Sequence, residues 1–170
     1  MALIRDRKLA SDSWQLLEVG EDGTVGPIPL LDDVIVPVAA WELQRGELVN
    51  RVGRVGVWLS GDDDPARVAG DLRYFSLIAV KFAAFTDGRG YSIGRLLRQR
   101  YGWRGELRAI GDVQRDQLYY LSRCGFDAFV LRSAEDEASA LSAFHDFTEP
   151  YQAAADQPLP LFRRRETVTG

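Results

Sequence analysis

Residues 77–94 read LIAVKFAAFTDGRGYSIG, and this stretch holds the two patterns that decide the fold. Its first six residues are almost all apolar, which is typical of a strand buried on both faces of a parallel sheet. A polar, glycine-containing loop follows, and apolar residues then recur at helical spacing from Ile93 to Tyr101, with Gly102 placed to end the helix. A strand, a loop and a helix in this order predict one β/α unit.

The same order repeats on both sides of this segment. The predicted strands are residues 54–59, 77–82, 106–110 and 126–131, and a last helix is predicted over 134–147. The inward helix faces are predicted to hold Val68, Leu72 and Phe75, then Ile93, Leu96, Leu97 and Tyr101, then Val113, Gln117, Tyr120, Leu121 and Cys124, then Ala138, Leu141 and Phe144. About four parallel β/α units make either a doubly wound sheet or part of a barrel, and the sequence leaves this choice open.

The N-terminal third has a different pattern. Two strand-like runs, 3–9 and 14–19, flank the turn-forming SDS and predict a small hairpin. Residues 38–48 are predicted to form a helix that covers the sheet, with Pro37 near its start.

One domain is the expected organisation, because 170 residues with 46% apolar content suffice for a single core. We expect an α/β domain over 1–150, made of the N-terminal extension at 1–50 and the βα core at 52–149. Residues 151–170 are expected to form an extended or mobile tail.

Composition restricts the partners and the compartment. A net charge of −4, from 21 basic and 25 acidic residues, argues against a nucleic-acid binder. The first residues carry charges where a signal peptide has an apolar core, and no apolar run reaches the roughly 18 residues that span a bilayer. We therefore expect a cytoplasmic protein without a membrane partner.

The sequence also predicts that the chain carries no metal centre or redox cofactor of its own. Its single cysteine, Cys124, falls on an apolar helix stripe and is interpreted as a buried hydrophobic residue. The single histidine, His145, lies late in the last predicted helix and has no nucleophile beside it in sequence, so no triad is predicted. Zinc, haem and iron–sulfur centres generally recruit several such ligands.

Polar residues follow each predicted strand, and parallel strands bring such residues to one edge of the sheet, where α/β domains bind ligands. They are Asp62, Asp63 and Asp64, then Thr86, Asp87 and Arg89, then Asp112 and Arg115, and last Ser133 and Glu135. The simplest interpretation is that Asp64, Asp87, Asp112 and Ser133 cap the helices that follow.

The loop Thr86-Asp87-Gly88-Arg89-Gly90-Tyr91-Ser92 is the strongest candidate for anion binding. Its glycines leave the backbone free to approach an anion at a helix start, and Arg89 could hold an oxyanion with two hydrogen bonds. The order of residues is neither a Walker loop nor the dinucleotide fingerprint. Alternatively, the glycines form a tight turn and Arg89 pairs with Asp87 or Asp112.

Lys81 is unusual because it lies inside an apolar strand. It is either a base with a lowered pKa or an anion ligand near the strand end, or else a side chain that extends to solvent there. Arg115 either joins the same edge or is solvated. The ligand-binding candidates are therefore Lys81, Thr86, Asp87, Arg89, Gly90, Ser92, Asp112 and Arg115. No catalytic residue is assigned.

Residues 85–129, with TDGRGYSI, GELRAIGDVQRDQ and RCGFDAF, resemble a bacterial family of unknown function described as probable oxidoreductases involved in sulfite reduction. This resemblance implies an association with assimilatory sulfite reduction and with a sulfite or nitrite reductase haemoprotein. It implies no catalytic residues. Sirohaem and an iron–sulfur cluster are expected only in that partner.

The first functional hypothesis is therefore an accessory protein that binds the reductase, with Trp103, Tyr119 and Tyr120 as possible docking residues. The alternative is a small-oxyanion-binding enzyme or sensor that uses the loop at Asp87-Gly88-Arg89-Gly90. A purely structural homo-oligomer fits the same sequence. Whether the chain is an enzyme stays open.

Overall fold

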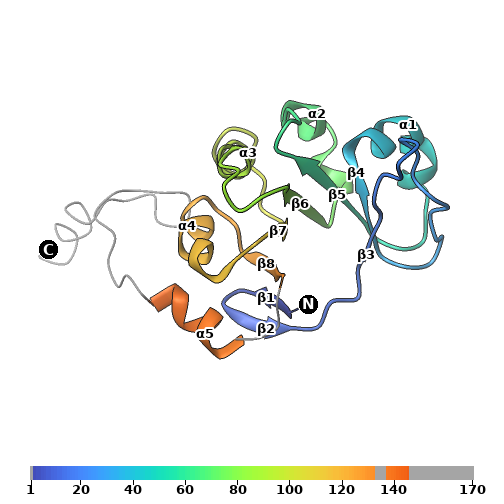
Figure 1. Cartoon of the computed structure of the whole chain (residues 1–170). Coiled ribbons are helices and arrows are strands. Elements are labelled where there is room, and N and C mark those ends of the chain that lie inside the picture. Colours follow the sequence, from blue (N-terminus) through green and yellow to red (C-terminus); the bar gives the residue numbers. More distant parts are fainter. Residues whose placement is uncertain (1, 133–136, 146–170) are drawn as a thin grey trace, which may run out of the picture.

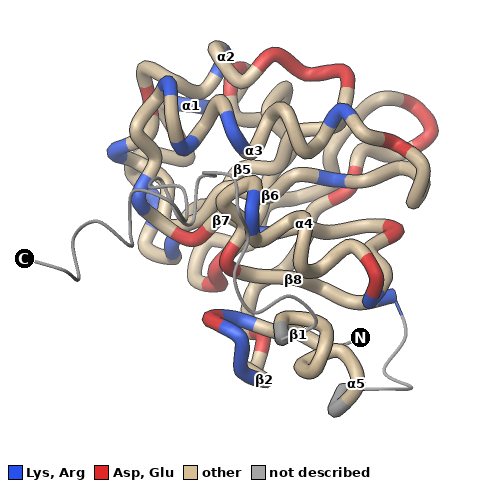
Figure 2. The backbone as a smooth tube through the Cα atoms, turned by 90° about the vertical axis from the view of Figure 1, so that its left-hand side faces the viewer, with Lys and Arg blue, Asp and Glu red and all other residues tan. Residues whose placement is uncertain are grey.

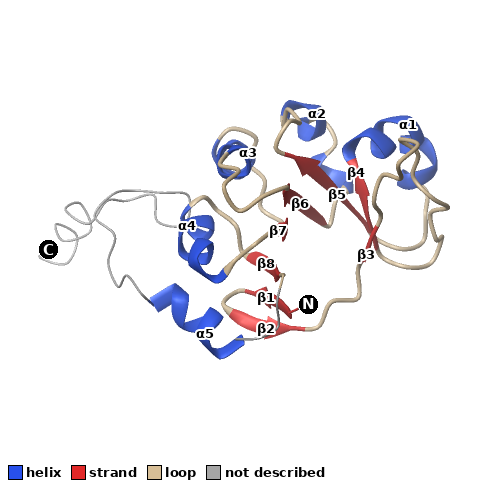
Figure 3. Cartoon of the chain, in the orientation of Figure 1, coloured by secondary structure: helices blue, strands red, loops and turns tan. Residues whose placement is uncertain are grey.

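The computed structural model describes residues 2–132 and 137–145 of the chain. In this part it contains one sheet of eight strands and five α-helices, ordered as Figures 1 and 3 show. The strands are β1 (Ala2–Arg5), β2 (Lys8–Ala10), β3 (Gln15–Leu16), β4 (Val34–Pro37), β5 (Val55–Ser60), β6 (Leu77–Phe82), β7 (Glu106–Gly111) and β8 (Ala128–Leu131). The helices are α1 (Val38–Val49), α2 (Ala66–Ala69), α3 (Arg89–Gln99), α4 (Leu118–Arg123) and α5 (Glu137–Ser142).

The sheet is mixed, which corrects the prediction of about four parallel units. Its strand order is β2-β1-β8-β7-β6-β5-β4-β3. Strands β3 to β8 pair in parallel, whereas β1 pairs antiparallel with both β8 and β2. The α/β class and the parallel pairing of the central strands are confirmed. The sequence pattern did not indicate the antiparallel strands β1 and β2 at one edge of the sheet.

Helices α1 to α4 follow one another along the outer side of the curved sheet (Figure 1). Alternate residues of the central strands divide between the two faces: Ile78 and Val80 face the helices in the main core. Leu77 and Ala79 face the inner side, where they pack with Trp58 in a smaller apolar cluster. Of the two predicted architectures the structure is the half-barrel, because a doubly wound sheet carries helices on both faces.

Residues 11–14, which we call the strap, join β2 and β3, the two edge strands of the sheet. Seven spacings of about 4.8 Å would set these edges about 34 Å apart in a flat sheet. Five steps from Ala10 to Gln15 span at most about 18 Å. The strap can therefore connect the two edges only because the sheet is curled.

The predicted positions of the four core strands are confirmed, and the predicted hairpin is wrong. Strand β6 has the predicted bounds, and β5, β7 and β8 differ from theirs by one or two residues. The predicted strands at 3–9 and 14–19 do not pair. Instead β1 pairs with β2 inside the first run, and β3 lies at the opposite edge, parallel to β4.

Two non-glycine residues explain this difference. The turn between β1 and β2 places Asp6 at φ 51° and Arg7 at φ 61°. Two-residue hairpin turns with positive φ usually contain Asn-Gly or a similar pair. Asp6-Arg7 is not such a pair, so no sequence signal indicated a turn here.

The predicted helices are confirmed in place but differ in length and in two of their faces. Helix α1 begins after Pro37 as predicted, while α2 is only four residues long. Gly102 and Gly125 adopt positive φ after α3 and α4, as expected for helix ends. Leu96 and Tyr120, predicted to face inward, are exposed. Residues 134–136 and 146–147 of the last predicted helix lie outside the described residues, as does the tail.

Candidate functional site

The candidate site is the edge formed by the carboxyl ends of β5, β6 and β7 and the loops that follow them. The loop after β5 carries a run of acidic residues beside α2 (Figure 2), and the loops after β6 and β7 carry both signs of charge. Asp64 accepts a hydrogen bond from the Ala66 N–H at 2.9 Å at the start of α2, but Pro65 holds the N-cap position that was predicted for Asp64. Ser133 and Glu135, predicted at the same edge, lie outside the described residues.

Arg89 is held between two loops of this edge. Its Nε and Nη2 each lie 2.9 Å from an oxygen of Asp87, and its Nη1 binds Asp62 in the loop after β5. The hydrogen bonds that Arg89 donates to Asp87 and the negative charge of Asp62 hold the pKa of Arg89 above its ordinary value. The alternative interpretation, pairing of Arg89 with Asp87, is thus observed, and the binding of an external oxyanion here stays a prediction.

Asp87 serves this pair and the helix start together. The hydrogen bond from the Arg89 side chain, and then the one from the Arg89 backbone N–H at 3.1 Å, lower the pKa of Asp87. Asp87 therefore accepts a backbone N–H at the start of α3 while it fixes the guanidinium, but Gly88 holds the N-cap position that was predicted for Asp87. A Cβ atom at Gly61 would come within 2.9 Å of the Asp87 carboxylate, so a glycine there lets the two loops approach.

Gly90 contributes to packing rather than to an open anion cradle. A Cβ atom at Gly90 would lie 2.6 Å from the Phe82 ring, and one at Gly94 would lie 2.4 Å from the Phe126 ring. Both glycines are buried on the face of α3 that lies against the sheet. They allow the helix to approach aromatic side chains beneath it.

Asp112 joins the loops after β6, β7 and β8. It accepts a hydrogen bond from the Phe85 N–H at 3.0 Å and another from Arg132 Nη1 at 3.1 Å. The Arg132 bond is the main cause that lowers the pKa of Asp112. Asp112 was predicted to cap the helix that follows it; the observed bonds tie loops together instead.

Lys81 points to the inner side of the half-barrel at the end of β6. Its Nζ lies 2.5 Å from a Glu18 carboxylate oxygen and 5.0 Å from the centre of the Trp58 ring. These contacts match the interpretation in which the side chain extends toward solvent at the strand end.

The other predicted site residues are dispersed. Arg115 donates to the Ser139 carbonyl oxygen at 3.0 Å and lies 3.4 Å from Asp116, so it fastens α5 rather than facing the edge. Thr86 is exposed in its loop, and Ser92 lies at a cavity between α3 and α4. The structure thus brings Asp87 and Arg89 together, and leaves Lys81, Ser92 and Arg115 apart from them.

Three partners of these side chains were not foreseen as partners: Glu18, Asp62 and Arg132. Asp62 was recognised at the edge, but no local pattern linked it to Arg89, 27 residues away. Glu18 lay in a run predicted to pair elsewhere. Sequence signals do not identify such long-range partners.

A second charged cluster lies on the inner side of the sheet and was missed. Arg108 on β7 is only 1% exposed, and its Nε and Nη1 donate to Glu106 at 2.7 Å and to Asp12 of the strap at 2.9 Å. Its Nη2 lies 2.7 Å from the same Glu106 oxygen without the geometry of a hydrogen bond. Arginine within a strand between apolar residues was the available signal.

Two kinds of feature are absent from the described residues. Residues 2–132 and 137–145 contain no group of three or more His, Cys, Asp or Glu side chains arranged to hold a metal ion. Within the same residues, none of the helices has the length and apolar character needed to cross a membrane.

The family model that matches the chain covers residues 56–162, from β5 through α5. It is described as a bacterial protein of unknown function (DUF934). The chain belongs to this family. The DUF934 segment contains the whole Asp87–Arg89 loop, Asp112 and Arg115, whereas Glu18 and the strap precede it. None of the curated proteins matches the chain.

Proposed function

We propose that this DUF934 protein is an accessory protein of assimilatory sulfite reduction that binds a sulfite or nitrite reductase haemoprotein. The proposal has two supports: the resemblance of residues 85–129, and an exposed apolar surface described below. In this proposal the sirohaem and iron–sulfur chemistry takes place in the partner. The chain supplies a docking surface.

The observation that carries the docking role is a group of three exposed aliphatic side chains, which we call the apolar patch. Leu30, Leu31 and Val52 are 73%, 76% and 81% exposed. Contiguous apolar groups on a surface mark sites of protein association, while single exposed apolar residues are common. The patch lies on the loops that precede β4 and β5, at the opposite end of the strands from the Arg89 edge.

The apolar patch is held in a defined shape. Gly53 N–H donates to the Leu30 carbonyl at 3.2 Å, and Arg51 donates to the carbonyls of Pro29 and Asp32. A Cβ atom at Gly53 would lie 2.2 Å from the Asp32 carbonyl oxygen, so the two loops approach closely only with glycine there. A surface fixed in this way loses little conformational entropy on binding, which favours association. The apolar patch lies before residue 56, where the match to the family model begins, so docking through the patch is proposed for this chain and not for the family.

The experiment is a pull-down of the tagged protein from its own host grown on sulfate. We expect a haemoprotein with a sirohaem absorption spectrum to co-purify with the unchanged chain. The variant L30D/L31D should lose it, because two charges at the centre of an apolar contact are strongly unfavourable. Leu9→Asp is the matched control, since Leu9 is an exposed leucine on β2 at the far edge of the sheet.

The outcomes of this experiment test the accessory role and the docking through the apolar patch separately. If no haemoprotein accompanies the unchanged chain, the accessory role is wrong. If the haemoprotein accompanies L30D/L31D and Leu9→Asp equally well, the accessory role stands and docking through the apolar patch is wrong.

A second candidate is the binding of a small oxyanion at the Asp87–Arg89 loop. Its support is that the Arg89 side chain is 56% exposed although it is paired. Sulfite or phosphate should then raise the melting temperature of the isolated protein, and Arg89→Ala should abolish the increase. An increase that persists in Arg89→Ala would exclude this loop.

A further inference from the structure

A cavity lies on the outer side of the protein, between α3 and α4, away from the Arg89 pair. Its volume is about 370 Å³, which is within the range of about 300–1,000 Å³ typical of small-molecule sites. A water molecule takes about 30 Å³, so an inorganic oxyanion would leave most of this space to solvent. The cavity is lined by Tyr91, Ser92, Arg95, Asp116, Gln117, Tyr120 and Cys124.

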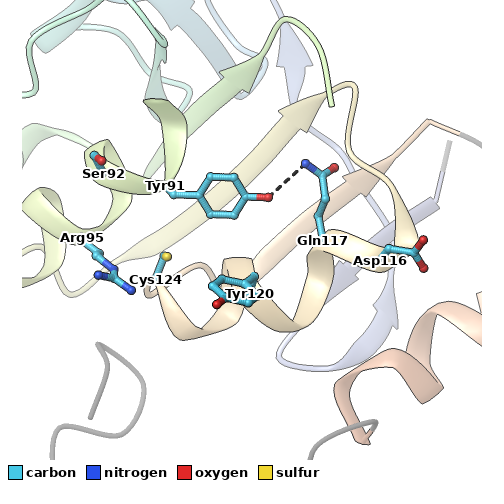
Figure 4. A pocket seen from close by; sticks show the side chains of 7 residues that line it. All are labelled: Tyr91, Ser92, Arg95, Asp116, Gln117, Tyr120 and Cys124. Carbon is cyan, nitrogen blue, oxygen red and sulfur yellow. Dashed lines mark hydrogen bonds between the residues drawn. The ribbon is translucent and has the colours of Figure 1, made fainter. Parts of the chain in front are cut away.

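Arg95 is the charged group that a ligand would meet. It is exposed, and within the described part of the chain no hydrogen bond, ion pair or ring contact engages its guanidinium. Arg89, Arg98 and Arg108, by contrast, are all bound to carboxylates. Figure 4 shows Arg95 and Asp116 at opposite ends of the cavity, with the Asp116 carboxylate directed away from Tyr91. The Arg95 end is therefore open to an anionic group.

The hydroxyl of Tyr91 is oriented by Gln117, which is almost fully buried. The Gln117 side-chain oxygen accepts from the Gln114 N–H at 2.9 Å, which fixes the direction of its amide. Its Nε2 then donates to the Phe85 carbonyl and to the Tyr91 oxygen, each at 3.1 Å. Because the Tyr91 oxygen already accepts this bond, its own proton is available to donate.

Aromatic rings line the space between these polar groups. The rings of Tyr91 and Tyr120 lie on two sides of it, and Cys124 closes the inner wall (Figure 4). Tyr120 is 65% exposed although it belongs to a helix packed on the sheet. An exposed ring opposite a second ring provides two faces against which a planar apolar group can stack.

We propose that this cavity binds a small organic anion, with its acidic group on Arg95 and a flat apolar body between Tyr91 and Tyr120. The acidic group is a carboxylate or a phosphate monoester, since a guanidinium pairs with either in the same two-bond geometry. This site is independent of the proposed function, because the apolar patch lies on the loops before β4 and β5.

Calorimetric titration of the full chain with four probes tests the site. Benzoate and phenyl phosphate each offer a ring with an acidic group, benzyl alcohol offers the ring alone, and inorganic phosphate offers the charge alone. We expect saturable binding of one or both ring anions, and much weaker binding of the other two probes. Whichever ring anion binds more tightly identifies the acidic group.

Two variants assign the binding to this cavity. Arg95→Gln should weaken binding of the ring anion by about tenfold or more, the loss expected for charge-assisted hydrogen bonds. Tyr120→Ala should weaken it by roughly two- to tenfold through loss of ring contact. Both side chains are exposed, so an unchanged melting temperature should show that the variants fold.

Arg104→Gln is the matched control, because Arg104 is also an exposed arginine and lies outside the cavity. Equal losses in Arg95→Gln and Arg104→Gln would mean non-specific attraction and would overturn the proposal. The same holds if inorganic phosphate or benzyl alcohol binds as tightly as the ring anions, or if none of the four probes binds.

Discussion

Gly90 lies in the loop that was predicted to bind an anion, but its contacts show that it serves the packing of α3 against the sheet. With Gly94 it places two hydrogen atoms against the rings of Phe82 and Phe126. The two positions are four residues apart, so they lie on one face of α3. The sequence GRGYSIG therefore brings the helix close to the sheet.

Replacement of Gly90 by alanine should destabilise the fold. The new methyl group would have to displace the Phe82 ring in a filled core, and overpacking of this kind typically costs about 1–3 kcal/mol. Urea unfolding followed by circular dichroism measures the loss. Gly88→Ala is the control, because Gly88 has φ −79° and open space around it. If both variants lost the same stability, the packing explanation would be wrong.

Asp71 is expected to make stability depend on pH. Its carboxylate accepts from Arg45 Nη2 at 2.6 Å and from Trp41 Nε1 at 2.9 Å. The Arg45 bond is the main cause that lowers the pKa of Asp71, and the Trp41 bond adds to it. Because the folded pKa is lowered, the stabilisation is complete above the unfolded value of about 3.9 and is lost as the pH falls through the folded value.

Asp71→Asn should therefore be less stable by about 1–3 kcal/mol near pH 7, and should lose less stability than the unchanged chain between about pH 5 and pH 3. Melting temperatures measured across this range test both parts. Glu47→Gln, an exposed change on α1, should leave the pH profile as it is. Parallel profiles for Asp71→Asn and the unchanged chain would contradict the assignment.

The strap joins the two edge strands of the curled sheet and also contacts the inner face of the sheet. Asp12 accepts from buried Arg108, and Trp14 packs on the inner apolar cluster. Asp12→Ala should destabilise the fold by about 1–3 kcal/mol, because it leaves a buried guanidinium short of one partner. Ser11→Ala and Ser13→Ala, at exposed neighbouring positions, should change stability by less than about 0.5 kcal/mol.

A double-mutant cycle separates the charge effect from any other loss at Asp12. If the cost of Asp12→Ala comes from the uncompensated charge of Arg108, it should largely disappear in the background of Arg108→Met. Additive losses in the double variant would show that the strap is held by its other contacts.

At the level of elements, the sequence predicted best the segments whose signal is local. Strand β6 was predicted with its observed bounds because six nearly apolar residues end in a polar loop. The strand β4, only four residues in a region rich in glycine and proline, carried no such contrast. The N-terminal strands depended on a turn at Asp6 and Arg7, whose positive φ values are uncommon for residues other than glycine.

In the candidate site too, contacts between residues close in sequence were predicted, and contacts between residues far apart in sequence were not. The Asp87–Arg89 pair spans two residues and was foreseen as an alternative. Asp62 and Glu18 reach their partners from 27 and 63 residues away. Tyr120 was wrongly placed inward because helical spacing indicates a face, while its exposure depends on how α4 sits beside α3.

Across the whole molecule, stability should decrease from the middle of the sheet to its edges. Strands β5, β6 and β7 are each paired on both sides in parallel and are mostly buried, whereas β2 and β3 lie at the edges and are mostly exposed. Amide hydrogen exchange should be slowest in the three central strands and fastest in the two edge strands. Comparable protection of β3 and β6 would contradict this gradient.

The pairing of β1 with β8 also has a consequence for synthesis. Ala2 meets Leu131, and Asp12 meets Arg108, which lies 96 residues further along the chain. Strand β1 is made well before β8, so until residue 131 has been synthesised β1 can pair only with β2. The pairing of β1 with β8 therefore forms late, after the local β/α units that lie between these two strands in the sequence.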